Sequence, residues 1–464
     1  MSLPIEATIV LDIGKTNVKL VLIDADGAVL AERRSPNTIL NCTPYPHHDT
    51  DRIWNWTLDG MQQFTALAHV GAIVSVTHGA TAALVDDEGL VLPVLDYEFE
   101  MPAGQGMHYA DERPPYSATY SPQLPAGLNL GRQLAWQAQA FPEEFRRARH
   151  ILMYPQYWAW RLSGVAASEV TSLGCHTDLW QPARQQYSSL VDRMGWTGLF
   201  PPLQPAWAPL GFLKAELARQ TGLSPECRVL CGIHDSNASL LRHFARADGG
   251  EGETPAVLST GTWVIAAAPG KPLEGLREAA DMLANSNAMG QAVACMRFMG
   301  GREFGELAGA ELEVCGVEDL RLLIERQTMA LPCYSQAGGP FAGRAGTIVG
   351  MTPQDNRQRY ALATLYCVLM SDYCLEQLGV DGAVVVEGSY TGNPWFAPLL
   401  AALRPDQQIN STDDTSGTTC GGWMLHHWGS APALRSTTAA PLRIDGWDQY
   451  RQRWLSLVET RRAD

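Results

Sequence analysis

Short apolar runs that end in glycine-containing turns recur along the chain and predict an α/β fold. Residues 7–13 form the first run, followed by the turn 14–17 and by a second apolar strand over 18–24. The same order returns at residues 256–266, where a turn of Ser, Thr and Gly joins two apolar strands. Two such hairpins, one opening each half, indicate a duplicated fold.

Helical spacing of apolar residues predicts helices over 51–67, 128–141, 142–149 and 154–163. Thr352 and Pro353 are typical of a helix start, and Gly379 is typical of the residue after a helix end. Between these elements, residues 95–123 are irregular and rich in Tyr, Glu, Pro and Met. A loop of this length favours a lid or pocket wall, in which Tyr97 and Glu98 are the candidate functional side chains.

The length predicts more than one domain. A single core usually supports roughly 250–300 residues, and this chain has 464, so two domains with a cleft between them are expected. The acidic, glycine-rich stretch 247–255 is a plausible boundary, which gives domains 1–246 and 247–464. Ligand sites favour such clefts.

Charge and composition narrow the class of partner. The formal net charge of −15 disfavours nucleic acid and anionic membranes as partners. No apolar run is typical of a membrane span or secretory signal, so we expect a cytoplasmic protein, and the sequence leaves a homodimer open. The ten scattered cysteines lack metal or redox spacing and are interpreted as reduced, mostly buried thiols.

Asp235 stands where an apolar run turns into a small-residue segment that can open a helix. Its carboxylate is either an ordinary helix N-cap or a catalytic group that faces the cleft. His78 follows a strand at 72–76 and has two comparable interpretations, a ligand donor or a histidine without a ligand. The pairs His47–His48 and His426–His427 lack companion ligands and are interpreted as solvated or structural.

The common nucleotide and hydrolase motifs GxxxxGK[ST], HExxH and GxSxG are absent from the sequence. Two hairpin turns with hydroxyl and N–H donors remain, together with an acid after the first strand, Asp12, and Asp235 at mid-chain. Transfer of a phosphoryl group to an alcohol requires donors for phosphate oxygens, a magnesium anchor and a base beside the acceptor hydroxyl.

Five stretches in this order resemble the successive motifs of the FGGY carbohydrate kinases, and the resemblance covers most of the chain. They are LDIGKTNVK (11–19), THG (77–79), GIHDSNA (232–238), LSTGTW (258–263) and VEGSYTGN (386–393). The resemblance implies an α/β protein of two ribonuclease-H-like, actin-like ATPase domains with an interdomain cleft. Residues 1–246 would bind the sugar and carry the base, and residues 247–464 would bind the nucleotide.

The resemblance also implies roles for individual residues. Asp235 would be the general base and Asp12 would help to hold Mg²⁺, while His78, Tyr97 and Glu98 would bind the sugar. The expected ATP-binding residues are Gly14, Lys15, Thr16, Asn17, Thr260, Gly261, Thr262, Gly388, Ser389 and Asn393. Lys15 and Ser389 depart from the residue types usual at these positions.

We therefore expect an ATP- and Mg²⁺-dependent kinase of a ketose or deoxyketose, of the L-fuculose, L-rhamnulose or pentulose type. The alternative is an inactive kinase homologue that senses a sugar. Retention of both Asp12 and Asp235 favours the enzyme, and the sequence does not identify the sugar.

Overall fold

The computed structural model describes residues 5–102, 108–244, 254–335, 338–412, 417–430 and 436–460. The chain divides into two compact units, the first with residues 1–250, 284–292 and 416–432, the second with residues 251–283, 293–415 and 433–464. The predicted boundary after residue 246 lies outside the described residues.

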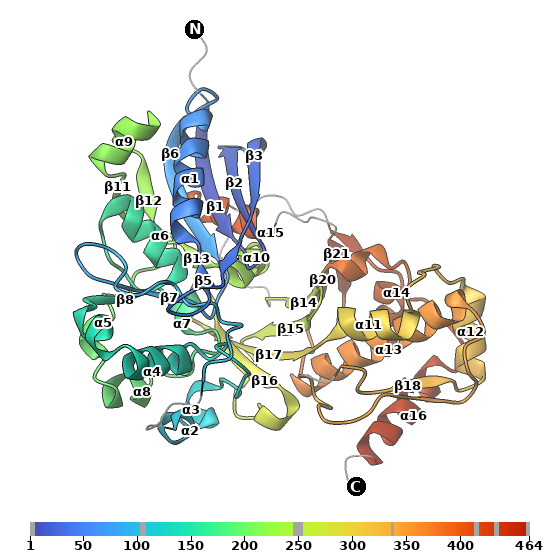
Figure 1. The fold of residues 1–464 in the computed structure, drawn as a ribbon. Coiled ribbons are helices and arrows are strands. Elements are labelled where there is room, and N and C mark those ends of the chain that lie inside the picture. Colours follow the sequence, from blue (N-terminus) through green and yellow to red (C-terminus); the bar gives the residue numbers. More distant parts are fainter. Residues whose placement is uncertain are drawn as a thin grey trace. The chain divides into compact units, whose positions relative to one another are not determined.

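The first unit is built on a seven-stranded sheet in the order β11-β12-β6-β1-β2-β3, with β13 also paired to β6 (Figure 1). Strands β1, β12 and β13 run parallel to β6, whereas β2, β3 and β11 are antiparallel to their neighbours. The bounds are β1 Glu6–Ile13, β2 Asn17–Asp24, β3 Val29–Pro36, β6 His69–Thr77, β11 Pro209–Phe212, β12 Arg228–Leu230 and β13 Ile233–His234.

Helices cover both faces of this sheet. Ile9 and Leu11 of β1 pack into a core shared with α1 (Thr50–Phe64) and α6 (Tyr154–Ser163). Val10, which points to the other face, packs into the core of α10 (Asp235–Phe244) and α15 (Gly417–His426). A strand buried on both faces must be apolar at every position, which explains its continuous apolar run.

Helices α10 and α15 approach each other closely. A Cβ atom at Gly421 would lie 2.0 Å from the carbonyl oxygen of Ala238, and one at Gly417 would lie 2.4 Å from the hydroxyl of Ser239. Only glycine leaves room for this contact, so these glycines serve helix packing. The α15 segment is thereby fixed beside the end of β13.

Residues 82–200 of the first unit add a second core around the antiparallel strand pair β7–β8 and helix α4. The segment 95–123, expected to be irregular, contains two short helices, α2 and α3, on either side of extended stretches. The bounds are β7 Ala82–Val85, β8 His150–Met153, α2 Tyr109–Glu112, α3 Tyr116–Thr119, α4 Leu130–Ala140, α5 Pro142–Arg147, α7 Val170–Leu173 and α8 Ser189–Arg193.

The second unit repeats the opening motif of the first. Strands β14 (Ala256–Thr260) and β15 (Val264–Pro269) form an antiparallel hairpin, and β20 (Val384–Gly388) runs parallel to β14, as β6 does to β1. The full sheet order is β16-β17-β15-β14-β20-β21-β22. The remaining main bounds are β16 Met282–Ser286, β17 Ala292–Phe298, β21 Ile409–Thr412, α11 Gly300–Ala308, α12 Val317–Glu325, α13 Asn356–Gln377, α14 Phe396–Leu403 and α16 Trp447–Thr460.

Most predicted elements are present, and one helix start is corrected. Helix α13 begins at Asn356, because the side chain of Asp355, not Thr352, accepts the capping hydrogen bond from the Gln358 N–H. All ten cysteines are free thiols and most are buried, as expected. In the described ranges, every helix is too short or too polar to cross a bilayer.

Candidate active site

Three predicted site residues follow neighbouring strands of the first sheet. Asp12 lies near the end of β1, His78 directly follows β6, and Asp235 directly follows β13. In the strand register, Ile13 pairs with Thr77, and Thr77 pairs with His234. Because these strands are parallel, their carboxyl ends meet at one edge of the sheet, which is where α/β proteins bind ligands.

The carboxylate of Asp235 is held through one of its oxygens. Oδ1 accepts hydrogen bonds from the Ser236 N–H at 2.6 Å and the Ser236 hydroxyl at 3.3 Å. Its other oxygen, Oδ2, has no hydrogen-bond partner among the described residues, and 27% of the side chain is exposed. Asp235 therefore both opens α10 and presents one oxygen to a ligand.

The His234 ring lies beside the same oxygen. Its Nε2 lies 3.2 Å from Asp235 Oδ1, and its Nδ1 lies 3.2 Å from the Asn237 amide nitrogen. The amide nitrogen can only donate, so Nδ1 is the acceptor and Nε2 carries the ring proton. Burial lowers the pKa of His234 to about 4, so the ring is a neutral imidazole at neutral pH.

Gly79 makes room for the His234 ring. A Cβ atom at Gly79 would lie 2.7 Å from Nε2 of that ring, so a larger residue would push the imidazole away from Asp235. The sequence motif Thr77-His78-Gly79 thus has a steric reason for its glycine.

The pKa of Asp235 is raised to about 6, chiefly because burial disfavours the charged carboxylate and also because the Asp12 charge lies nearby. His78 and the hydrogen bonds from Ser236 oppose this shift. A carboxylate with such a pKa is ionised at neutral pH yet is a better proton acceptor than an ordinary aspartate.

His78 offers an acceptor to a ligand. Its Nδ1 lies 3.0 Å from the Gly79 carbonyl oxygen, so Nδ1 carries the proton and Nε2 is an acceptor. Nε2 is buried and has no partner among the described residues. Burial lowers the pKa of His78 to about 4, which keeps the ring neutral.

His48 lies beside His78, with ring centroids 5.1 Å apart. Only 1% of the residue is exposed, so of the two predicted interpretations, solvated or structural, the solvated one is excluded at this position. Both of its ring nitrogens are buried without a partner in the described ranges, and burial holds its pKa well below the usual value. Buried polar atoms are normally paired, so these nitrogens point to a ligand or ordered water.

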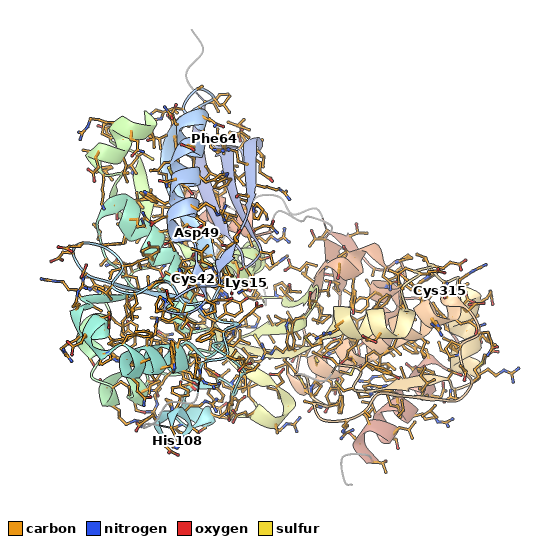
Figure 2. The ribbon with its side chains drawn as sticks, viewed as in Figure 1. Lys15, Cys42, Asp49, Phe64, His108 and Cys315 are labelled. Atoms are coloured by element: carbon orange, nitrogen blue, oxygen red, sulfur yellow. The ribbon has the colours of Figure 1, made fainter. Side chains whose placement is uncertain are left out.

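Lys15 (Figure 2) belongs to the turn after β1 and lies over the ring of Tyr97. Its ammonium forms an ion pair with Asp96, lies 3.3 Å from Glu98, and sits 4.6 Å from the centre of the Tyr97 ring. The Asp235 charge contributes to the raised pKa of Tyr97, and Lys15 contributes to the lowered pKa of His78. The predicted sugar residues and Lys15 therefore share one site, and a contact of Lys15 with ATP stays a prediction.

Asp12 has one oxygen engaged and one open. Oδ2 accepts hydrogen bonds from the Thr418 hydroxyl at 2.8 Å and the Lys19 ammonium at 3.3 Å. Oδ1 has no partner among the described residues. No group of three or more potential metal ligands occurs in those residues. One open carboxylate fits Mg²⁺, which usually keeps several waters and binds one or two carboxylates plus substrate phosphates.

The first turn, residues 14–17, presents donors at its surface. Its own carbonyls are occupied, because Asn37 donates from its side chain to Gly14 and from its backbone to Thr16, each at 2.8 Å. The N–H groups of Lys15 and Thr16 have no partner in the described ranges. Thr16 and Asn17 are exposed, so the turn suits an anion such as phosphate.

The predicted nucleotide residues of the second unit meet where β14 and β20 end. The Thr260 hydroxyl donates to the Glu387 carbonyl oxygen at 2.5 Å and accepts from the Tyr390 N–H at 2.9 Å. Gly388 has φ +88°, and a Cβ atom there would lie 1.9 Å from the Thr260 carbonyl oxygen. Thr260 thus joins the two turns, and its hydroxyl is already engaged.

The side chains left for a nucleotide are those of Thr262 and Ser389, which are exposed and whose hydroxyls have no partner in the described ranges. Asn393 is buried and links α13 to the start of α14, through Thr364 at 2.9 Å and the Trp395 N–H at 3.1 Å, and its contact with a nucleotide stays a prediction. Gly301, at the start of α11, was not predicted. A Cβ atom there would lie 2.3 Å from the Gly261 carbonyl oxygen, so α11 abuts the same turn.

Comparison with known proteins identifies the family. Residues 7–241 match the N-terminal domain of the FGGY family of carbohydrate kinases, and residues 252–434 match a carbohydrate kinase FGGY C-terminal domain. The chain belongs to the FGGY family of carbohydrate kinases. The predicted fold, two sheet-containing domains of the actin-like ATPase type, is thereby confirmed.

Similar proteins include other sugar kinases. The crystal structure of a carbohydrate kinase from Novosphingobium aromaticivorans is 37% identical, with a TM-score of 0.91 and 99% of each chain covered. A xylulose kinase from Lactobacillus acidophilus shares the fold at 16% identity, with a TM-score of 0.78 and coverage of 99% and 98%. The L-fuculokinase of Salmonella typhi is 28% identical over 56% of each chain, so the match spans about half the length of this curated relative.

Several site residues of this FGGY chain were not predicted. Thr418 is separated from Asp12 by 406 positions, and the packing of α15 against α10, β1 and β6 brings it near. His48 belongs to a pair without ligand spacing, and no local pattern marks it. The Gly300–Gly301 pair after a strand was the one available signal, since glycines there permit close backbone approach.

Proposed function

We propose that the chain is an ATP-dependent kinase that phosphorylates a hydroxyl of a ketose or deoxyketose, with Asp235 as general base. The main support is the state of Asp235, with one oxygen fixed, one oxygen open and a pKa raised to about 6. Relatives named L-fuculokinase and probable L-xylulose kinase support a substrate of the L-fuculose, L-rhamnulose or pentulose type.

In this mechanism the sugar hydroxyl donates its hydrogen bond to Asp235 Oδ2. As its oxygen bonds to the γ-phosphorus, the bond from that phosphorus to the bridging oxygen breaks and ADP leaves, while the proton passes to Asp235. Ser236 keeps Oδ1 fixed by hydrogen bonds, beside the His234 ring, so that Oδ2 stays directed at the substrate. A second sugar hydroxyl donates to His78 Nε2, and His48 supplies a further partner.

The remaining predicted residues would bind sugar, nucleotide and metal. Tyr97 and Glu98 would line the sugar site, the turn 14–17 and the Thr260 and Gly388 turns would bind ATP, and Asp12 would hold Mg²⁺ through water. When bound, Mg²⁺ supplies charge neutralisation to the phosphate oxygens. Under this proposal, residues 1–246 bind the sugar and residues 247–464 bind the nucleotide.

The test is a coupled assay of ADP release over a panel of ketoses, with wild type and Asp235→Asn. We expect sugar-dependent ADP release in the wild type and a loss of at least about 10³-fold in Asp235→Asn, with ATP binding retained. Asp59→Asn, on the exposed face of α1, is the matched control and should keep full activity.

The assay also separates the alternatives. Sugar binding without ADP release would favour a sensing homologue, and sugar-independent ADP release would favour an ATPase of another kind. Phosphorylation by Asp235→Asn near the wild-type rate would refute the assignment of the base.

A further inference from the structure

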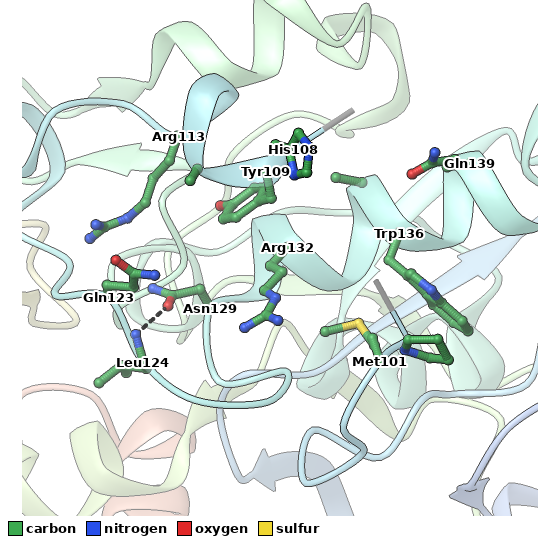
Figure 3. Close-up of a pocket in the computed structure, with 13 residues that line it drawn as sticks. Met101, His108, Tyr109, Arg113, Gln123, Leu124, Asn129, Arg132, Trp136 and Gln139 are labelled. Atoms are coloured by element: carbon green, nitrogen blue, oxygen red, sulfur yellow. Dashed lines mark hydrogen bonds between the residues drawn. The ribbon is translucent and has the colours of Figure 1, made fainter. Parts of the chain in front are cut away.

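A cavity of about 240 Å³ lies along one face of α4 in the first unit (Figure 3). It is walled by the end of the Tyr97 loop, helix α2 and the segment before α4. It differs from the site around Asp235, none of whose described residues line it. The lining residues are Met101, Pro102, His108, Tyr109, Ala110, Arg113, Gln123, Leu124, Asn129, Arg132, Ala135, Trp136 and Gln139.

The charge of this cavity is positive in a protein of net charge −15. Two arginines and a histidine line it, and no carboxylate is among the described lining residues. A concave surface lined by one sign of charge attracts ligands of the opposite sign.

Arg113 and Arg132 differ in their partners. Arg113 is paired with Asp178, whose side chain is fully buried, at 3.2 Å. Arg132 has neither a hydrogen bond nor an ion pair through its guanidinium within the described ranges. Figure 3 shows that guanidinium directed into the cavity between Asn129 and Met101. Arg132 is therefore a partly buried cation that lacks a counterion.

The other polar side chains hold the walls of the cavity in place through hydrogen bonds. The Asn129 amide is fixed by Leu124 N–H at 2.8 Å and by the Pro122 carbonyl oxygen at 3.1 Å. Tyr109 donates to Asp178 at 2.7 Å. The walls of the cavity are therefore preorganised, and the guanidinium fork of Arg132 is left to bind an anion.

We propose that this cavity binds a phosphomonoester no larger than a sugar phosphate, with Arg132 as its anchor. A guanidinium presents parallel N–H donors that match two phosphate oxygens, and His108 at the rim adds a donor. The volume lies below the ~300–1,000 Å³ range of drug-sized ligands, which favours a ligand smaller than a nucleotide. Trp136, Met101 and Leu124 supply apolar walls for the carbon skeleton. The proposal does not depend on the kinase activity.

Helix α4 connects this cavity to the site around Asp235. Gln133, next to Arg132, donates to the carbonyl oxygens of Ala80, at 2.6 Å, and Gly127. Gly127 in turn donates to the Tyr97 carbonyl oxygen at 2.8 Å. Through these hydrogen bonds, a ligand bound to Arg132 would affect the position of the backbone beside His78 and Tyr97.

Calorimetric titration tests the proposal with fructose 1-phosphate, inorganic phosphate, gluconate and fructose as probes. We expect fructose 1-phosphate to bind, and Arg132→Gln to weaken that binding at least about tenfold. Ala110→Phe, which fills the cavity from an exposed position of α2, should weaken it similarly. Arg146→Gln removes an exposed arginine of α5 that is paired with Glu143 and should leave it unchanged.

The two cavity variants distinguish this site from binding of a product beside Asp235, which neither variant touches. Binding of fructose 1-phosphate that survives both variants, or no binding at all, would overturn the proposal. An Arg132-dependent site that takes gluconate or inorganic phosphate but not fructose 1-phosphate would refute the phosphomonoester assignment.

Discussion

The raised pKa of Asp235 has a direct kinetic consequence. If this carboxylate accepts the proton of the sugar hydroxyl, only its ionised form is active. With a pKa of about 6, about 9% of the molecules are ionised at pH 5, whereas an ordinary aspartate with a pKa of 3.8 would be about 94% ionised. We therefore expect kcat/KM for the sugar to fall about tenfold from its plateau value by pH 5.

The sign follows from the environment of the carboxylate. Burial and the Asp12 charge disfavour the anion, so protonation occurs at a higher pH than in water. The activity is then present above the raised pKa and is lost as the pH falls through it. An acid with an unperturbed pKa would keep its activity to below pH 5.

The assay is initial-rate ADP release from pH 4.5 to 8 at saturating ATP, with the best ketose of the panel. The phosphate groups of ATP also titrate near pH 6, so the pH profile of kcat/KM is measured at two Mg²⁺ concentrations. If the acidic limb of the profile lies at the same pH at both concentrations, it reports a group of the enzyme. Re-assay at pH 7.5 after exposure to pH 5 excludes denaturation. Full kcat/KM at pH 5 would refute the reasoning that burial tunes this base.

Three further predictions concern stability and binding. Asp235→Asn should raise the unfolding free energy by up to about 3 kcal/mol at pH 7.5, because the buried charge of Asp235 lowers stability only above the pKa of the unfolded state. In urea titrations near pH 4 this gain in unfolding free energy should vanish. A gain that is the same at pH 4 would contradict the prediction. Gly388→Ala should lower the melting temperature and raise the KM for ATP, because the φ of Gly388 is +88° and the added Cβ would meet backbone atoms. The control Gly392→Ala, in the same turn, adds a Cβ that meets nothing within 4 Å and should be near neutral. Equal effects of the two variants would argue against the turn geometry. His78→Phe should raise the KM for the sugar about 5- to 150-fold without changing the KM for ATP. The control His69→Phe, at an exposed position, should change neither KM. A changed KM for ATP in His78→Phe would contradict the placement of His78 in the sugar site.

The fold was predictable from the sequence because its signals are local. Strands buried on both faces leave continuous apolar runs, as in β1, and the hairpins at residues 7–24 and 256–266 have the same pattern of apolar strands and glycine turns. The start of α13 was missed because a proline at 353 is a strong local signal, while Asp355 acts through a single hydrogen bond.

The environment of the candidate base was not predictable, because it depends on residues far apart in sequence. The motif at residues 232–238 identifies Asp235, yet its Oδ1 lies 3.2 Å from a histidine ring that fits only because Gly79, in the loop after β6, has no side chain. Asp12 is held in the same way by Thr418, whose helix packs against Val10 of β1 through Gly422 and against α10 through Gly417 and Gly421.

The position of Asp235 at the start of α10 decides between the two interpretations given to it from the sequence. An N-cap side chain accepts from the N–H group two or three residues further on, whereas Asp235 is the first residue of α10 and its Oδ1 accepts the N–H of the next residue, Ser236. Oδ1 is thus held by Ser236 beside the His234 ring, and Oδ2 is left open. Opening α10 at the edge where β1, β6 and β13 end therefore orients the carboxylate, and burial at that edge raises its pKa toward the range that a base requires.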